Sequence, residues 1–137
     1  MGHHILVVED HAELRRMLAT ALRLSGYEIS EATSGTEAIE KAACARPSLI
    51  ILDLGLPDMS GIDAARAIKK NPLTTNIPII TITAYSEEYG LEETLRVGIV
   101  AYLYKPVPLA LIKAKIEEFI SPTDENWDRN QARFKGE

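Results

Sequence analysis

Short apolar runs alternate along the chain with segments whose apolar residues recur every three or four positions. The runs are rich in Val, Ile and Leu, and they predict β-strands at residues 5–8, 27–32, 49–52, 77–83 and 100–104. The segments that follow each run predict five helices, since apolar residues at i, i+3, i+4 and i+7 share one helix face. In the first helix the residues predicted to face the core are Leu14, Met17, Leu18, Ala21 and Leu22.

Glycine, proline and serine mark the boundaries of these helices. Gly26 ends the first helix and Pro47 follows the second. Ser60 opens the third helix, and Gly98 ends the fourth, which carries Leu91 and Leu95. The apolar residues of the last helix are Leu109, Ile112, Ile116 and Phe119.

Alternation of strands and helices predicts an α/β fold with a parallel sheet covered on both faces. The third strand is the most apolar and should be central, whereas the second is more polar and should lie nearer an edge. With right-handed crossovers, the leading topology is a doubly wound five-stranded sheet of order 2-1-3-4-5, the flavodoxin-like (βα)5 arrangement. Ligands of such sheets bind beyond the carboxyl ends of the strands, between strands 1 and 3.

The length of 137 residues is enough for one domain. We predict that the domain occupies residues 1–120, because the composition changes after residue 120. Residues 121–137 are predicted to be a polar tail or linker, with a short extra helix carrying Trp127 and Phe134 as the alternative. The net charge of −5 argues against a nucleic-acid surface, which requires a basic patch, and disfavours a membrane surface for the same reason.

The single cysteine, Cys44, excludes an intrachain disulfide and suits a reducing cytoplasm. Its position in a run of alanines predicts a small core residue. The N-terminus has no pattern of a signal peptide, and no apolar run reaches the ~20 residues that span a membrane. His3 and His4 are expected to begin a strand rather than to bind a metal. These observations predict a cytoplasmic protein.

Polar residues stand at the carboxyl ends of four predicted strands. Glu9 and Asp10 follow the first strand, Asp53 the third, Thr83 the fourth and Lys105 the fifth. These strand ends face one crevice, so the side chains should converge. Three carboxylates brought together repel one another, and a hard divalent cation such as Mg²⁺ resolves that repulsion. An aspartate nucleophile in such a site can form an acyl phosphate.

Each residue taken alone has a simpler interpretation. Asp10 and Thr83 each precede a predicted helix and would ordinarily be N-caps, and Lys105 would be a solvated charge. These interpretations do not explain why polar residues occupy four strand ends together, so the joint chemical interpretation is favoured.

The motifs at these strand ends resemble those of the receiver domains of two-component response regulators. They are Val8-Glu9-Asp10, the loop at residues 53–61 (DLGLPDMSG), Thr83-Ala84 and Lys105-Pro106. The resemblance covers about residues 4–120, and the motifs are specific as an ordered set.

The resemblance implies a phosphorylation site with a bound cation. Asp53 would accept the phosphoryl group. Mg²⁺, or Mn²⁺, would be held by Glu9, Asp10, Asp53 and the main-chain carbonyl of Gly55.

The resemblance also implies a switch. Thr83, Ala84 and Lys105 would bind the phosphoryl oxygens, and a cis bond would join Lys105 to Pro106. Phosphorylation would draw Thr83 toward the phosphoryl group and turn Tyr102 inward. The face formed by helix 4, strand 5 and helix 5 would change accordingly.

The implied function is that of a signalling switch rather than an enzyme, although it assists its own phosphorylation and dephosphorylation. The phosphoryl donor would be a histidine kinase or a histidine phosphotransfer protein. A downstream protein would bind the changed face, and a homodimer is a further assembly left open. No direct contact with nucleic acid or a membrane is expected.

Several positions depart from the commonest family pattern. Glu9 stands where aspartate is usual, residues 98–101 are unusually apolar, and Val107 replaces a common phenylalanine. Gly55 should leave water access to the site, whereas Tyr85 is expected to cover it partly and to slow hydrolysis of the acyl phosphate.

Three other classes of protein fit the sequence less well than a signalling switch. An aspartyl phosphatase usually carries a second aspartate two residues after the first, where this chain has Gly55. A flavin carrier needs a phosphate loop after strand 1, where Glu9 and Asp10 would repel a phosphate. A receiver that binds partners without chemistry is disfavoured because all the required side chains are present.

Overall fold

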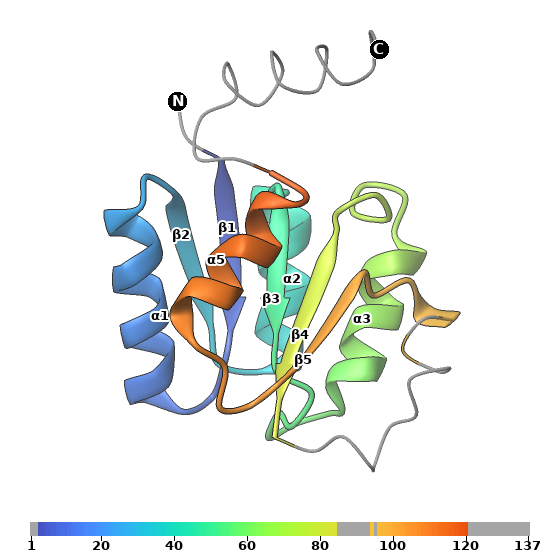
Figure 1. The fold of residues 1–137 in the computed structure, drawn as a ribbon. Coiled ribbons are helices and arrows are strands. Elements are labelled where there is room, and N and C mark those ends of the chain that lie inside the picture. Colours follow the sequence, from blue (N-terminus) through green and yellow to red (C-terminus); the bar gives the residue numbers. More distant parts are fainter. Residues whose placement is uncertain (1–2, 85–93, 95, 121–137) are drawn as a thin grey trace, which may run out of the picture.

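The computed structural model describes residues 3–84, 94 and 96–120. Its centre is a parallel sheet in the order β2-β1-β3-β4-β5, which confirms the predicted topology (Figure 1). The strands are β1 (His4–Val8), β2 (Glu28–Ala32), β3 (Leu49–Leu52), β4 (Ile79–Thr83) and β5 (Ala101–Tyr104). β3 is central and β2 lies at an edge, as their contrasting apolar content predicts.

Helices cover both faces of this sheet. They are α1 (Ala12–Leu24), α2 (Gly35–Ala45), α3 (Gly61–Lys70) and α5 (Leu109–Glu117). The helix predicted to carry Leu91 and Leu95 lies largely outside the described residues, although Thr94, Arg96 and Val97 are helical. None of the helices described here combines the length and the apolar character needed to cross a lipid bilayer. The predicted tail at residues 121–137 lies outside the described residues.

Two hydrophobic clusters, one on each face, explain why residues 5–8 of β1 and all residues of β3 are apolar. Successive side chains of a strand point to opposite faces of the sheet. In β1, Ile5 and Val7 join the cluster beneath α1 and α5, whereas Leu6 and Val8 join the cluster beneath α2 and α3. These residues therefore need apolar side chains on both faces, as is typical of central strands in a sheet buried on both sides.

The helix boundaries follow the local signals in the sequence. Ser34 and Ser60 are the N-caps of α2 and α3, and each accepts a hydrogen bond from a main-chain N–H of the first turn. Gly26 follows α1 with φ 103°, and Gly98 follows the helical residues Arg96 and Val97 with φ 102°. Both glycines adopt the left-handed conformation that side chains disfavour.

Three predictions of buried residues are wrong. Cys44 is exposed, because the buried residues of α2 are Ala38 and Ala42 and a helix turns about 200° between Ala42 and Cys44. Met17 is 65% exposed and Leu109 is 41% exposed. Both side chains line an open pocket between α1 and α5 instead of a closed core.

Candidate functional site

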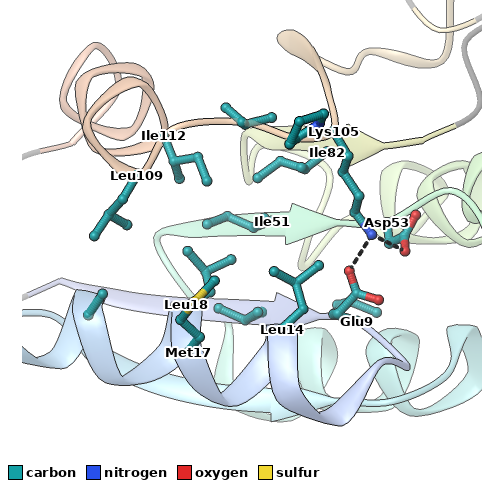
Figure 2. A pocket seen from close by; sticks show the side chains of 15 residues that line it. Glu9, Leu14, Met17, Leu18, Ile51, Asp53, Ile82, Lys105, Leu109 and Ile112 are labelled. Atoms are coloured by element: carbon teal, nitrogen blue, oxygen red, sulfur yellow. Dashed lines mark hydrogen bonds and ion pairs between the residues drawn. The ribbon is translucent and has the colours of Figure 1, made fainter.

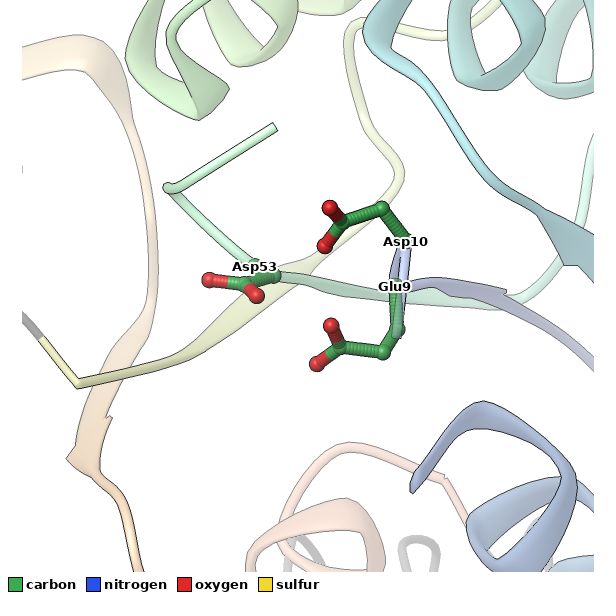
Figure 3. Close-up of side chains that lie close together, drawn as sticks. All are labelled: Glu9, Asp10 and Asp53. Atoms are coloured by element: carbon green, nitrogen blue, oxygen red, sulfur yellow. The ribbon is translucent and has the colours of Figure 1, made fainter. Parts of the chain in front are cut away.

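The site lies where β1 and β3 end side by side. These strands pair in parallel with Val8 opposite Leu52, and the Asp53 N–H donates to the Val8 carbonyl over 3.1 Å. Glu9 and Asp53 consequently leave the sheet at the same level. One carboxylate oxygen from each of Glu9, Asp10 and Asp53 lies within 4.8 Å of the others (Figure 3). The structure thus brings together the three carboxylates predicted to meet.

Burial differs among these carboxylates. Glu9 is 5% exposed and Asp53 is 7% exposed, whereas Asp10 is exposed to solvent. The interpretation of Asp10 as an N-cap is wrong, because His11 is the N-cap of α1. The Asp10 carboxylate is therefore not committed to capping the helix and lies over the two buried ones.

Lys105 reaches this group from the end of β5. Its Nζ donates to Glu9 Oε1 over 2.7 Å and to Asp53 Oδ2 over 3.0 Å (Figure 2). The Lys105 N–H donates to the Thr83 carbonyl over 2.9 Å, which ties the end of β5 to the end of β4. The Lys105–Pro106 bond is cis, in agreement with the expectation from the motif. The interpretation of Lys105 as a simple solvated charge is wrong.

The buried ion group shifts the proton affinities of its members. Burial raises the pKa of Glu9 and the charge of Asp53 adds to that effect, while hydrogen bonds from Lys105 and the His11 N–H oppose it. Burial lowers the pKa of Lys105, but its hydrogen bonds to Glu9 and Asp53 outweigh burial and leave that pKa raised. Lys105 therefore remains a cation at neutral pH.

The loop after β3 shapes the other side of the site. The Gly55 N–H donates to Asp53 Oδ1 over 3.0 Å, so the two Asp53 oxygens have different partners. Gly55 is exposed and forms an isolated antiparallel bridge with Ser60. No carboxylate stands at Gly55, which leaves the site without the second acid expected of an aspartyl phosphatase.

The donor set fits a hard divalent cation. Three carboxylates and one ammonium leave two net negative charges when all the acids are ionised. Oxygen ligands of this kind suit Mg²⁺, which binds through a few carboxylates and keeps several waters. The residues present can therefore hold such an ion.

An apolar pocket of about 500 Å³ opens beside the ion group, between α1 and α5 (Figure 2). Its polar end is formed by Glu9, Asp53 and Lys105. The apolar side chains that line it come from both helices and the sheet, and include Leu14, Met17, Leu18, Ile51, Ile82, Leu109 and Ile112. Sequence reasoning missed this pocket, because helical periodicity does not reveal how closely two helices approach.

The other predicted residues take the following positions. Thr83 is fully buried at the end of β4, and Ala84 is exposed immediately after it. Tyr102 is half-buried in β5, and its ring centroid lies 5.0 Å from that of Tyr104. Tyr85 lies outside the described residues.

Sequence reasoning also missed a support for the turn after β1. Arg15 Nη1 donates to the Glu9 carbonyl over 3.0 Å, and Arg15 Nε donates to Glu31 Oε1 over 3.1 Å. Arg15 thereby connects α1, the acidic turn and β2. No motif links Arg15 with Glu31, so only the fold reveals this contact.

Comparisons with known proteins agree with the geometry. The family described as "Response regulator receiver domain" matches residues 5–117. The chain is 39% identical to the phosphate regulon transcriptional regulatory protein PhoB of Pseudomonas aeruginosa PAO1, over 90% of this chain and 54% of PhoB. It is 36% identical to the chemotaxis protein CheY of Thermotoga maritima, over 77% of this chain and 88% of CheY.

A solved structure is similar over most of its length. It is the receiver domain of the sensor histidine kinase PA1611 from Pseudomonas aeruginosa PAO1, with a magnesium ion coordinated in the active-site cleft. That domain is 30% identical, has a TM-score of 0.80, and is matched over 88% of this chain and 98% of its own. The chain spans about half the length of the first curated relatives it matches. The family match covers most of the chain, the sheet topology agrees with it, and three carboxylates converge at the expected end of the sheet. This chain therefore belongs to the receiver domains of two-component response regulators.

Proposed function

We propose that Asp53 accepts a phosphoryl group from a histidine kinase or a histidine phosphotransfer protein. The observation that carries this proposal is the convergence of Glu9, Asp10 and Asp53 with the Lys105 ammonium at one end of the sheet. Asp53 is chosen as the acceptor because it follows the central strand β3 and its two oxygens contact Lys105 and the Gly55 N–H. Family membership supports the same chemistry.

Glu9, Asp10, Asp53 and the main-chain carbonyl of Gly55 would hold the cation, Mg²⁺ or Mn²⁺. Such an ion neutralises charge on the phosphoryl oxygens that approach the acidic site. The magnesium in the cleft of the similar PA1611 receiver domain supports Mg²⁺ as the first choice.

The transfer itself forms one bond and breaks another. A carboxylate oxygen of Asp53 attacks phosphorus and forms the acyl phosphate. The bond from phosphorus to the leaving group breaks, and the leaving group, a donor imidazole or acetate, takes the electron pair. Lys105, Thr83 and Ala84 would bind the phosphoryl oxygens, so the domain assists its own phosphorylation and the later hydrolysis.

The response would reach a partner through β5 and α5. Tyr102 is half-buried in β5, where it pairs with Thr81 of β4, and its ring centroid lies 5.0 Å from that of Tyr104, which pairs with Thr83. In this proposal Tyr102 turns inward when Thr83 moves toward the phosphoryl group. Val100, Tyr104 and Leu111 are exposed apolar side chains on or beside these elements, with 43%, 53% and 43% exposure. An exposed apolar surface of this kind suits a downstream protein, or a second copy of the chain, as its binding partner.

Covalent labelling tests the acceptor. The protein is incubated with Mg²⁺ and acetyl phosphate, and its intact mass is measured. We expect a base-labile increase of one phosphoryl group, dependent on Mg²⁺ and absent in Asp53→Asn. A wild-type protein that stays unlabelled, or an Asp53→Asn variant that is labelled equally, would contradict the proposal. The proposed function involves no direct contact with nucleic acid or a membrane. The cytoplasmic location stays a prediction from the sequence.

A further inference from the structure

A second acidic residue, Asp58, makes a contact that the proposed chemistry does not use. It lies in the loop between β3 and α3, the loop that begins with Asp53. Its Oδ1 accepts from the Gly35 N–H over 2.8 Å. Its Oδ2 accepts from the Thr36 N–H over 2.9 Å and from Thr36 Oγ1 over 2.7 Å. Asp58 thus joins the loop to the start of α2, where Gly35 and Thr36 precede it by 23 and 22 residues in sequence.

These bonds complete the N-terminus of α2. The first four N–H groups of a helix have no partner within the helix. Here the Ser34 side chain accepts from the Glu37 N–H and the Ser34 carbonyl accepts from the Ala38 N–H. The Ala38 bond is the first within the helix, and Asp58 accepts from two of the N–H groups that precede it, those of Gly35 and Thr36. Hydrogen bonds from Thr36 and Gly35 lower the pKa of Asp58 to about 2, so the contact is made by a carboxylate.

Packing reinforces the same contact. A Cβ placed on Gly35 would lie 2.7 Å from Met59 Sδ, so the absence of a side chain at Gly35 lets Met59 lie directly against α2. Asp58 and Met59 therefore hold the tip of the loop with polar and apolar contacts together.

The tip is connected rigidly to the phosphoacceptor end of the loop. Gly55 forms an antiparallel bridge with Ser60, and the Gly61 N–H donates to the Leu54 carbonyl over 2.8 Å. A Cβ on Gly61 would lie 2.6 Å from the Asp53 carbonyl oxygen, which shows how closely the two ends of the loop approach. These contacts hold the two ends of the loop against each other, next to Asp53 and Gly55.

We propose that Asp58 is a positioning residue for the phosphoacceptor site: by binding the N-terminus of α2 it holds the β3–α3 loop in the conformation that orients the Asp53 carboxylate and the Gly55 main chain. The inference rests on the proposed function, since orientation matters there for metal binding and phosphoryl transfer. Small misplacements of such groups are costly because reactive geometry must be held closely.

The test compares Asp58→Ala with Asp63→Asn. Asp63 is an exposed acid on α3 whose carboxylate pairs with the nearby Arg66, so Asp63→Asn removes an equal charge without touching the loop contact. Mg²⁺ affinity is measured by calorimetry without a phosphodonor, and phosphorylation by acetyl phosphate is followed over a range of donor concentrations. We expect Asp58→Ala to weaken Mg²⁺ binding by roughly tenfold, as loss of an outer-shell support usually does, and Asp63→Asn to leave it unchanged.

Thr36→Val provides an independent arm, because it removes one bond to Asp58 without altering the loop. Its effect on Mg²⁺ affinity should be smaller than that of Asp58→Ala and should vanish when Asp58 is already alanine. Amide hydrogen exchange at Gly61 should be faster in Asp58→Ala, which reports loosening of the loop without any metal.

Two outcomes separate the inference from the proposed function. If Asp58→Ala lowers the melting temperature but binds Mg²⁺ like wild type, Asp58 only caps α2 and the inference is overturned. If wild type binds Mg²⁺ but is never labelled at Asp53, the proposed function fails while the affinity comparison still decides the role of Asp58.

Discussion

Lys105 and Glu9 form an ion pair of 2.7 Å between the ends of β5 and β1, two strands separated by β3 and β4 in the sheet. The same ammonium contacts Asp53 at 3.0 Å. In this arrangement the lysine occupies the space between two carboxylates that are proposed to hold a cation. Under the proposed function, this pair would compete with the cation, and Lys105 would be released to bind a phosphoryl oxygen.

Removal of the Lys105 charge should tighten metal binding and slow phosphorylation. We expect Lys105→Gln to bind Mg²⁺ about tenfold more tightly, corresponding to ~1.4 kcal/mol, because a competing cation is gone. Labelling by acetyl phosphate should become slower, because the phosphoryl oxygens lose their partner. Calorimetry without phosphodonor and timed mass spectrometry measure the two effects separately. Unchanged or weaker Mg²⁺ binding would show that Lys105 does not compete.

The two glycines of the β3–α3 loop should respond differently to an added methyl group. In Gly61→Ala, the new Cβ would lie 2.5 Å from Leu54 Cα and 2.6 Å from the Asp53 carbonyl oxygen. Neither backbone atom can move easily, so we expect a loss of about 2–3 kcal/mol in the free energy of unfolding, as for other overpacked sites. Urea unfolding of Gly61→Ala and wild type measures this difference in the free energy of unfolding.

Gly55→Ala is the matched control for that substitution. The nearest atom to its Cβ would be Asp53 Oδ1 at 3.9 Å, an ordinary van der Waals distance. Its free energy of unfolding should stay within about 0.5 kcal/mol of wild type. Equal losses in the two variants would contradict the geometry of the loop.

Met17 should contribute little to stability although the apolar pattern of α1 predicts a core position. It is 65% exposed, whereas Leu22 on the same helix is fully buried. We expect Met17→Ala to change the free energy of unfolding by less than about 0.5 kcal/mol. Leu22→Ala should cost about 2–5 kcal/mol, because it opens a cavity in a closed core. A comparable cost for Met17→Ala would mean that the pocket between α1 and α5 is closed in solution.

The low pKa of Asp58 predicts a specific acid dependence. Its folded pKa of about 2 lies below the ordinary value of 3.8, so its stabilising bonds to Gly35 and Thr36 are fully present above pH ~4. They are lost as the pH falls from about 4 through about 2. The free energy of unfolding of Asp58→Asn should therefore be lower than that of wild type at pH 7. The difference should shrink toward pH 2, measured by urea titrations at pH 7, 4 and 2.5.

Asp63→Asn serves as the control, because Asp63 pairs with Arg66 on an exposed helix surface. Exposed pairs of this kind contribute little to stability. A pH dependence that is the same in Asp58→Asn and wild type would exclude a contribution of the Asp58 carboxylate to acid stability.

Local patterns were sufficient to predict the strand order and the convergence of Glu9, Asp10, Asp53 and Lys105. Continuous apolar runs predict strands buried on both faces, and parallel strands place their carboxyl ends at one edge of the sheet. Residues that end such strands must meet there whatever their separation in sequence. The arrival of Lys105 and Glu9 at the same edge, although they are 96 residues apart, is the clearest example.

The errors concern residues whose environment depends on how two elements approach. Met17 has helical core spacing, but α1 and α5 leave an open pocket over it. Asp10 has the sequence position of an N-cap, but the turn places His11 there and leaves the Asp10 carboxylate beside those of Glu9 and Asp53. Periodicity reports which side a residue faces, and it does not report the distance to the next element.

By itself, the sequence determined the fold class, the edge of the sheet that carries the chemistry and the acids gathered there, because these depend on strand order and local pattern. Only the tertiary structure decided that Lys105 contacts Glu9 as well as Asp53, and that Asp58 ties the β3–α3 loop to Gly35 and Thr36. The physical reason is that hydrogen bonds and ion pairs act over about 3 Å. Such contacts are set by the packing of whole helices and strands, which no local run of residues encodes.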